Sequence, residues 1–272
     1  MSDRSALAAL LEFYRDVGVH TALSEAPVDW FARSRGESAR AARQADERTE
    51  PRPQTNHDPR PAPSAPPVTV PSEAVVMAAR EAAAAAPTLE ALRGTLASFE
   101  GCNLRLTATN LVFADGNPEA RIMFVGEAPG FEEDLQGLPF VGRSGQLLDR
   151  MLAAIGLDRT SVYIANVIPW RPPGNRTPTP QETEICRPFI RRQIELCDPD
   201  ILVMLGGASA KQLLETNEGI LKLRGKWRSF QTGNREIRAL ATLHPAYLLR
   251  QPLQKRLVWR DLLAIKQALA DT

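Results

Sequence analysis

The sequence has little cysteine, no long apolar run and almost no net charge. Three cysteines in 272 residues are too few for a disulfide framework, so a reducing cytoplasm is the expected location. No apolar run has the length that a bilayer requires, so we expect no membrane association. Acidic residues interrupt the N-terminal stretch MSDRSALAALLEFYRD, which argues against a signal peptide. The net charge of +1 by itself says nothing about nucleic acid.

Charge is nevertheless distributed unevenly along the chain. Residues 201–272 carry twelve Lys or Arg against five Asp or Glu. A solvated helix face is the simpler interpretation of this excess, and a surface facing the phosphates of nucleic acid is the functional one. On charge alone the solvated face is favoured, so a nucleic acid partner needs support from other residues.

The chain divides into three parts by its sequence pattern. Residues 1–34 have Leu7, Leu10, Leu11 and Tyr14 at helical spacing, which predicts an amphipathic helical extension. Residues 35–71 contain eight of the 22 prolines and no hydrophobic periodicity, which predicts a disordered linker. We expect residues 72–272 to form the main folded domain.

From about residue 105 onward, apolar runs alternate with helical patterns. The runs LRLTATNLVF, ARIMFVG, SVYIANV, DILVMLG and EIRALATLHP predict strands. Thr179, Pro180 and Glu182 form a capping box with proline at the first helical position, which predicts a helix that ends near Leu196. Near-continuous apolar strands joined by helices predict an α/β fold. We expect three α/β/α layers around a central, mainly parallel four-stranded sheet.

Three of the predicted strands end in polar residues. Glu127 follows IMFVG, Asn166 follows VYIA, and His244 follows ALATL. Ligands of open parallel sheets bind beyond the carboxyl ends of the strands, so these three side chains should meet in one crevice. Each alone is more often a solvated acid, a turn cap or a structural histidine, but together they predict a site with a carboxylate, an amide and an imidazole.

The segments around these residues resemble family 4 of the uracil-DNA glycosylase superfamily. GEAPGFEEDLQGLPFVGRSGQLLDRML (126–152) is similar to the family's first motif. IANVIPWRPPGNRTPTPQE (164–182) and LHPAYLLRQP (243–252) are similar to its later motifs. The resemblance covers roughly residues 100–270. It implies that residues 72–272 are a catalytic domain that hydrolyses the N-glycosidic bond of uracil in DNA and so initiates base excision repair.

The resemblance also implies roles for the site residues. Glu127 matches the carboxylate that stabilises the sugar cation and orients water, and His244 matches the donor to the departing base. Asn166 matches the residue that reads uracil, and Phe140 the aromatic that stacks on the flipped base. Glu133 matches the position that excludes the methyl group of thymine. Without the resemblance, Phe140 is as readily a core residue and Glu133 a solvated acid.

Two further groups are expected to contact DNA. Leu248 or Leu249 is the candidate wedge that holds open the gap left by a flipped base, and Arg250 beside them seeks phosphate. The alternative is that both leucines belong to the core. The backbone amides near Gly130, Gly142 and Gly145 are expected to bind phosphates at turns and at a helix start.

The sequence departs from its family at the iron–sulfur cluster. Family 4 enzymes usually hold a [4Fe–4S] cluster on four cysteines, of which Cys102 and Cys186 match two. Phe99 and Trp170 stand at the other two positions. We therefore expect an apolar plug and no cofactor, with a cluster completed by Cys197 as the alternative.

The expected partner is uracil-containing DNA, bound by a monomer without a metal in the chemical step. The corresponding stretch of a covalently trapping branch of the superfamily holds a histidine, whereas LKLRGKWRSF (221–230) has none, which predicts turnover. A broader glycosylase for hypoxanthine and xanthine is the rival enzyme. A non-catalytic DNA-damage-binding module is the rival from another class, as is an N-terminal extension that recruits a protein partner.

Overall fold

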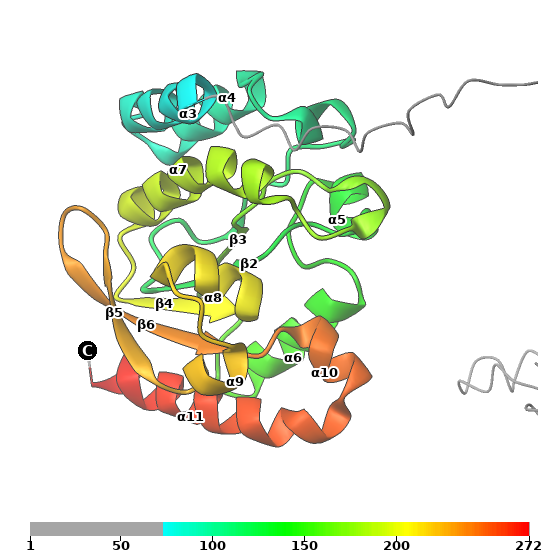
Figure 1. The fold of residues 1–272 in the computed structure, drawn as a ribbon. Coiled ribbons are helices and arrows are strands. Elements are labelled where there is room, and N and C mark those ends of the chain that lie inside the picture. The colour runs from blue at the N-terminus through cyan, green and yellow to red at the C-terminus, as the bar shows by residue number, and fades with distance from the viewer. Residues whose placement is uncertain (1–72, 272) are drawn as a thin grey trace, which may run out of the picture. The chain divides into compact units, whose positions relative to one another are not determined.

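The structure is a computed structural model that describes residues 73–271 (Figure 1). The predicted extension over 1–34 and the predicted linker over 35–71 lie outside the described residues. The first half holds α3 (Glu73–Ala85), α4 (Leu89–Ser98), η1 (Asn103–Leu106), β1 (Asp115–Gly116), β2 (Ile122–Gly126), α5 (Phe131–Gln136), α6 (Arg143–Ala153), β3 (Tyr163–Asn166) and η2 (Pro173–Asn175). The second half holds α7 (Pro180–Cys197), β4 (Ile201–Leu205), α8 (Gly207–Leu214), α9 (Ile220–Leu223), β5 (Trp227–Gln231), β6 (Glu236–Thr242), α10 (Pro245–Arg250), η3 (Pro252–Gln254) and α11 (Lys255–Ala270).

The described strands form one sheet of six strands in the order β1-β3-β2-β4-β6-β5. The four central strands β3, β2, β4 and β6 are parallel, as predicted, and β1 and β5 add an antiparallel strand at each edge. The predicted four-stranded sheet is therefore its parallel core. The register sets Gly126 opposite Asn166 and Leu205 opposite Thr242, so these carboxyl ends meet at one edge.

Helices cover both faces of the sheet and make the three predicted layers (Figure 1). One core cluster joins α3, α4, α7 and α8 to alternate residues of β2, among them Met123 and Val125. The other joins α6, α10 and α11 to the intervening residues, Ile122 and Phe124. Because successive side chains of a strand point to opposite faces, the five buried residues of β2 serve both clusters.

One predicted strand is absent from the sheet. The run LRLTATNLVF instead forms η1 and an irregular segment, and only Asp115–Gly116 pairs beyond it. The backbone N–H groups of Thr109 and Asn110 donate to Asp134 of α5 at 2.8 and 3.0 Å. Val112 N–H donates to the carbonyl of Pro169 at 2.9 Å. Leu104, Val112 and Phe113 of the run are buried and Leu106 is exposed, while these backbone N–H groups are satisfied by a helix and a loop.

The edge strand β5 was not among the predicted strands. Only Phe230 of its five residues is buried, so it lacks the apolar pattern that marks a central strand. Among residues 73–271, no helix has both the length and the apolarity to cross a membrane.

Candidate active site

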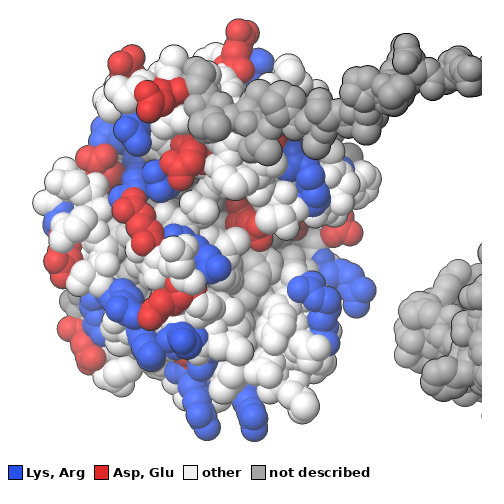
Figure 2. Space-filling view, viewed as in Figure 1, with Lys and Arg blue, Asp and Glu red and all other residues white. Residues whose placement is uncertain are grey.

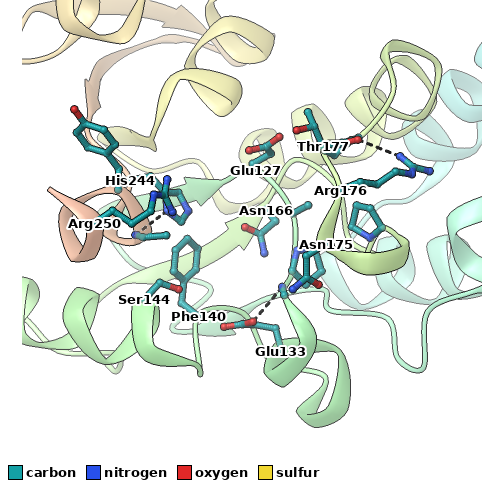
Figure 3. Close-up of a pocket in the computed structure, with 17 residues that line it drawn as sticks. Glu127, Glu133, Phe140, Ser144, Asn166, Asn175, Arg176, Thr177, His244 and Arg250 are labelled. Atoms are coloured by element: carbon teal, nitrogen blue, oxygen red, sulfur yellow. Dashed lines mark hydrogen bonds between the residues drawn. The ribbon is translucent and has the colours of Figure 1, made fainter. Parts of the chain in front are cut away.

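A pocket of about 520 Å³ opens at the carboxyl ends of the parallel strands (Figure 3). Glu127 lies just beyond β2, Asn166 ends β3, and His244 follows β6, so the three predicted side chains do line one pocket. Its remaining lining residues are Ala128, Pro129, Gly130, Glu133, Phe140, Ser144, Pro172, Asn175, Arg176, Thr177, Pro178, Ala246, Tyr247 and Arg250.

Asn166 lines this pocket and has an unused acceptor. The residue is buried, and its side-chain Oδ1 has no hydrogen-bond partner among the described residues. An unsatisfied buried oxygen costs free energy, and buried polar groups in folded proteins are nearly always paired. The orphaned oxygen therefore indicates a ligand that brings an N–H donor to it.

His244 is arranged as a neutral donor. The N–H of Ala246 donates to its Nδ1 at 3.1 Å, where His244 caps α10. The single proton of the neutral ring is then on Nε2. Burial, helped by the positive charge of Arg250, lowers the pKa of His244 to about 4. The ring is therefore uncharged at neutral pH and offers one N–H.

Glu127 is half-buried and lies above Asn166 in the view of the pocket, with Phe140 to the left of Asn166 (Figure 3). Burial raises the pKa of its carboxyl group above the ordinary value. The backbone carbonyl of Glu127 accepts from Ile168 N–H at 3.0 Å, which fixes the loop after β2 against the loop after β3. A raised carboxylate pKa in a pocket is typical of a group that exchanges protons or stabilises positive charge.

Phe140 packs against the imidazole, with ring centroids 5.5 Å apart and a 31° angle between the planes. Gly126 makes room for this arrangement. A Cβ on Gly126 would lie 2.4 Å from Asn166 Oδ1 and 2.6 Å from Phe140 Cζ. Glycine at the end of β2 is thus required by two pocket side chains at once, a role that the sequence pattern alone did not reveal.

Glu133 is buried and already fully engaged. Its carboxylate accepts the N–H groups of Gly130, Val141 and Gly142 at 3.0, 3.0 and 2.9 Å. The amides of Gly130 and Gly142, which were expected to bind phosphates, are therefore occupied by this side chain. Gly145 allows a close approach instead, since a Cβ there would lie 1.6 Å from the Phe140 carbonyl oxygen. These residues shape the loop that carries Phe140.

The two candidate wedge leucines differ in exposure. Leu248 is 1% exposed and belongs to the core cluster under α10, so it cannot reach a DNA duplex. Leu249 is 39% exposed. Arg250, the next residue, lines the pocket. The structure therefore leaves Leu249 as the wedge candidate.

The segment from Pro172 to Pro178 forms one wall of the pocket, and the sequence did not indicate this role. Arg171 anchors its start, because its guanidinium lies 4.9 Å from the Phe131 ring and donates to Asn175 Oδ1 at 2.6 Å. Arg176 anchors its end through Glu182 of α7, at 2.6 Å. The proline content of this segment and its position just before the capping box of α7 were the only signals in the sequence that pointed to an ordered loop here.

The fold and the site define a class: an α/β enzyme with a pocket for a flat, hydrogen-bonding ring beside a carboxylate. The sequence model of the Uracil DNA glycosylase superfamily matches residues 113–263. The chain belongs to this superfamily, whose members are hydrolases acting on N-glycosyl bonds. The predicted family, fold class and enzyme class are thereby confirmed.

Similar proteins narrow the class. A type-4 uracil-DNA glycosylase of Thermotoga maritima is 44% identical over 164 residues, which are 59% of this chain and 84% of that protein. One of Archaeoglobus fulgidus is 43% identical over 57% of this chain and 80% of its own. One of Sulfurisphaera tokodaii is 40% identical over 66% and 84%. These relatives confirm the prediction of a uracil-DNA glycosylase of DNA repair.

The same relatives correct the prediction that no cofactor is needed, because type-4 enzymes carry a [4Fe–4S] cluster. The thiols of Cys102 and Cys186 lie 3.9 Å apart in the core, where Cys186 donates to Cys102. Phe99 and Trp170 pack in that core cluster. Among residues 73–271, no three His, Cys, Asp or Glu side chains gather as a metal site.

Proposed function

We propose that this chain excises uracil from DNA with Glu127 and His244 as its catalytic residues and Asn166 as the reader of the base. The unpartnered Oδ1 of Asn166 is the observation that carries the proposal. Uracil brings an N3–H donor to that oxygen and an O4 acceptor to the amide nitrogen. Cytosine has a bare N3 acceptor there, so two acceptors would face each other and its binding is disfavoured.

The base reaches this pocket only after leaving the DNA stack. It then stacks on Phe140, the ring that packs beside His244. Leu249 fills the gap in the duplex, and Arg250 holds a neighbouring phosphate. Glu133 supports the stacking of the base indirectly: it accepts hydrogen bonds from three backbone N–H groups and so fixes the loop between Gly130 and Gly142 that carries Phe140.

Hydrolysis breaks the bond between C1′ of the sugar and N1 of uracil. The bonding electron pair leaves with the base, whose negative charge at O2 is stabilised by the Nε2–H of His244. The sugar gains oxocarbenium character, which the Glu127 carboxylate stabilises while it orients a water molecule toward C1′. The water oxygen bonds to C1′ and its proton passes to Glu127, from which it returns through solvent to N1 of the uracil anion, so that neutral uracil is released and the Glu127 carboxylate is restored.

Affinity for DNA arises from a basic surface next to the pocket. Lys255 and Arg256 open α11 a few residues after Arg250 and are exposed. Figure 2 shows mostly Lys and Arg over the part of this face that α9 and α11 occupy, whereas both signs mix over α3 and α7. The three free, buried cysteines are consistent with work in the cytoplasm.

The test is single-turnover excision on a uracil duplex, with a binding titration on the same DNA. Glu127→Ala and His244→Ala should each lower the rate on the order of a hundredfold or more, because each removes a preorganised partner of charge that develops as the bond breaks. Their affinity for the duplex should change little. Asn166→Ala should lower both base recognition and rate, and Glu119→Ala serves as an exposed control.

Three results would contradict the proposal. Near wild-type excision by Glu127→Ala would mean that another carboxylate orients the attacking water. An absence of alkali-labile sites on uracil DNA would favour a non-catalytic binding module. Equal excision from duplexes carrying hypoxanthine or xanthine would show that Asn166 does not select uracil.

A further inference from the structure

Phe140 is held in a conformation that bulky residues avoid. Its φ is 55°, in the left-handed region where a side chain other than glycine is strained. The strain falls on the residue proposed to stack on the base, and strained backbone persists only where the surroundings enforce it. The contacts of the two peptide groups next to Phe140 therefore determine where its ring lies.

Arg159 supplies those contacts from the loop after α6. Its Nη1 donates to the carbonyl of Pro139 at 3.1 Å, and its Nη2 donates to the carbonyl of Phe140. Both carbonyls that flank the Phe140 Cα thus accept from one guanidinium. Two parallel donors in a planar group fix the direction of both carbonyls at once, which a single ammonium does less well.

The guanidinium is itself fixed. Its Nη1 lies 2.5 Å from Asp115 of β1, and its Nε lies 2.8 Å from Asp149 of α6. The side chain is 25% exposed, so these ion pairs are partly shielded from water. Two elements far apart in the sequence therefore hold Arg159 against the loop.

Glu133 holds the other end of the same peptide group. The Phe140 carbonyl accepts from Arg159, and the N–H of the next residue, Val141, donates to Glu133 at 3.0 Å. Relaxing the φ of Phe140 would turn this peptide away from both charged groups. Gly145 allows the arrangement, because any Cβ there would meet the Phe140 carbonyl.

We propose that Arg159 is a positioning residue for base stacking: it locks Phe140 in its left-handed conformation and so sets the plane on which the flipped base lies. This rests on the proposed role of Phe140. Arg159 acts through Phe140 and touches neither the base nor the sugar.

The experiment is a double-mutant cycle on single-turnover uracil excision by the full chain, using Arg159→Ala, Phe140→Ala and their combination. Misplacing a binding group by about 1 Å costs on the order of a hundredfold in rate, so Arg159→Ala should lose about tenfold to a hundredfold. If Arg159 acts through the ring, that loss should disappear once Phe140 is alanine. Arg159→Lys, which keeps one cation near Asp115, should recover part of the rate.

Arg235→Ala is the matched control. Arg235 likewise pairs with two carboxylates, Asp198 and Asp200, and donates to the Asp198 carbonyl. It precedes β6 at the amino ends of the parallel strands, away from the pocket. Because distant sites act independently, its loss should change the excision rate by less than about twofold, which is on the order of the assay scatter.

The outcomes separate the two proposals. If Phe140→Ala excises at the wild-type rate, the stacking role fails. If Phe140→Ala is slow but Arg159→Ala is not, or the two losses multiply, the stacking role stands and the positioning role of Arg159 is overturned. Should Arg159→Ala not fold, the cycle is run with Arg159→Lys, and a wild-type rate for that variant overturns the positioning role.

Discussion

At the scale of single residues, Asn166 and His244 are prepared for the base in opposite ways. The acceptor of Asn166 is left open, whereas Nδ1 of His244 is filled by the N–H of Ala246. One group therefore awaits a donor, and the other has its own donor fixed in direction. Preorganisation of this kind lets the site stabilise developing charge without rearranging during the reaction.

The opposite pKa shifts of Glu127 and His244, the two proposed catalytic side chains, predict the pH dependence of kcat/KM. Burial raises the pKa of Glu127, and burial with Arg250 lowers that of His244 to about 4 from an ordinary 6.5. As pH falls, Glu127 gains its proton first, and His244 stays neutral through pH 6.5. We expect His244 to cause no fall of kcat/KM near pH 6.5, and kcat/KM to fall as pH drops through the raised pKa of Glu127.

The measurement is a pH–rate profile of the wild type beside Glu127→Gln, in which this acidic fall should be missing. A fall centred near pH 6.5 that persists in Glu127→Gln would assign it to His244 instead. Stability follows the same shifts with opposite signs. The depressed pKa of His244 removes stability as pH falls from 6.5 toward 4, because the unfolded chain takes the proton first. The raised pKa of Glu127 adds stability as pH falls, because here the folded chain takes the proton before the unfolded chain does.

At the scale of elements, the strength of the local signal decided what the sequence could predict. The capping box formed as predicted, with Thr179 and Glu182 exchanging hydrogen bonds at 3.2 and 2.7 Å, and α7 runs to Cys197. Such a signal is contained within four residues. The conformation of LRLTATNLVF is not determined by so local a signal, because its backbone partners, Asp134 and Pro169, are brought to it only by the fold.

The cap of α7 should contribute to stability more than to catalysis. Thr179→Ala removes the acceptor of the Glu182 N–H and should lower the free energy of unfolding by about 1 kcal/mol. Urea denaturation measures the change, with Thr95→Ala inside α4 as a control that loses no cap. The rate of uracil excision should be affected less than the free energy of unfolding, because Arg176 in the pocket wall still pairs with Glu182. An unchanged unfolding midpoint would mean that water replaces the cap.

At the scale of the whole molecule, the parallel sheet gathers the site. Glu127, Asn166 and His244 lie far apart in sequence, and they could be placed together because the carboxyl ends of parallel strands share one edge. The wall from Pro172 to Pro178 and the Arg159 contacts could not be predicted. Both depend on long side chains that reach across loops, and no periodicity records such contacts.

The pocket's composition also predicts how the chain responds to loss of its N-terminal third. The lining residues that the structure describes lie between Glu127 and Arg250. The proline-rich run over 35–71 has no apolar pattern with which to join that core. Deleting residues 1–71 should therefore leave single-turnover excision on short uracil oligonucleotides within about threefold of the full chain, because a proline-rich run without an apolar pattern is expected to form no part of the pocket.

The comparison requires a truncated protein whose thermal unfolding is cooperative, so that lost activity cannot be attributed to lost folding. Rates on a short duplex and on a long one should be measured side by side. Equal rates on the short duplex with slower excision on the long one would place the extension in DNA search or recruitment. A large loss on the short duplex by a well-folded truncation would mean that residues 1–71 reach the pocket or the DNA beside it, contrary to the boundary inferred from the prolines.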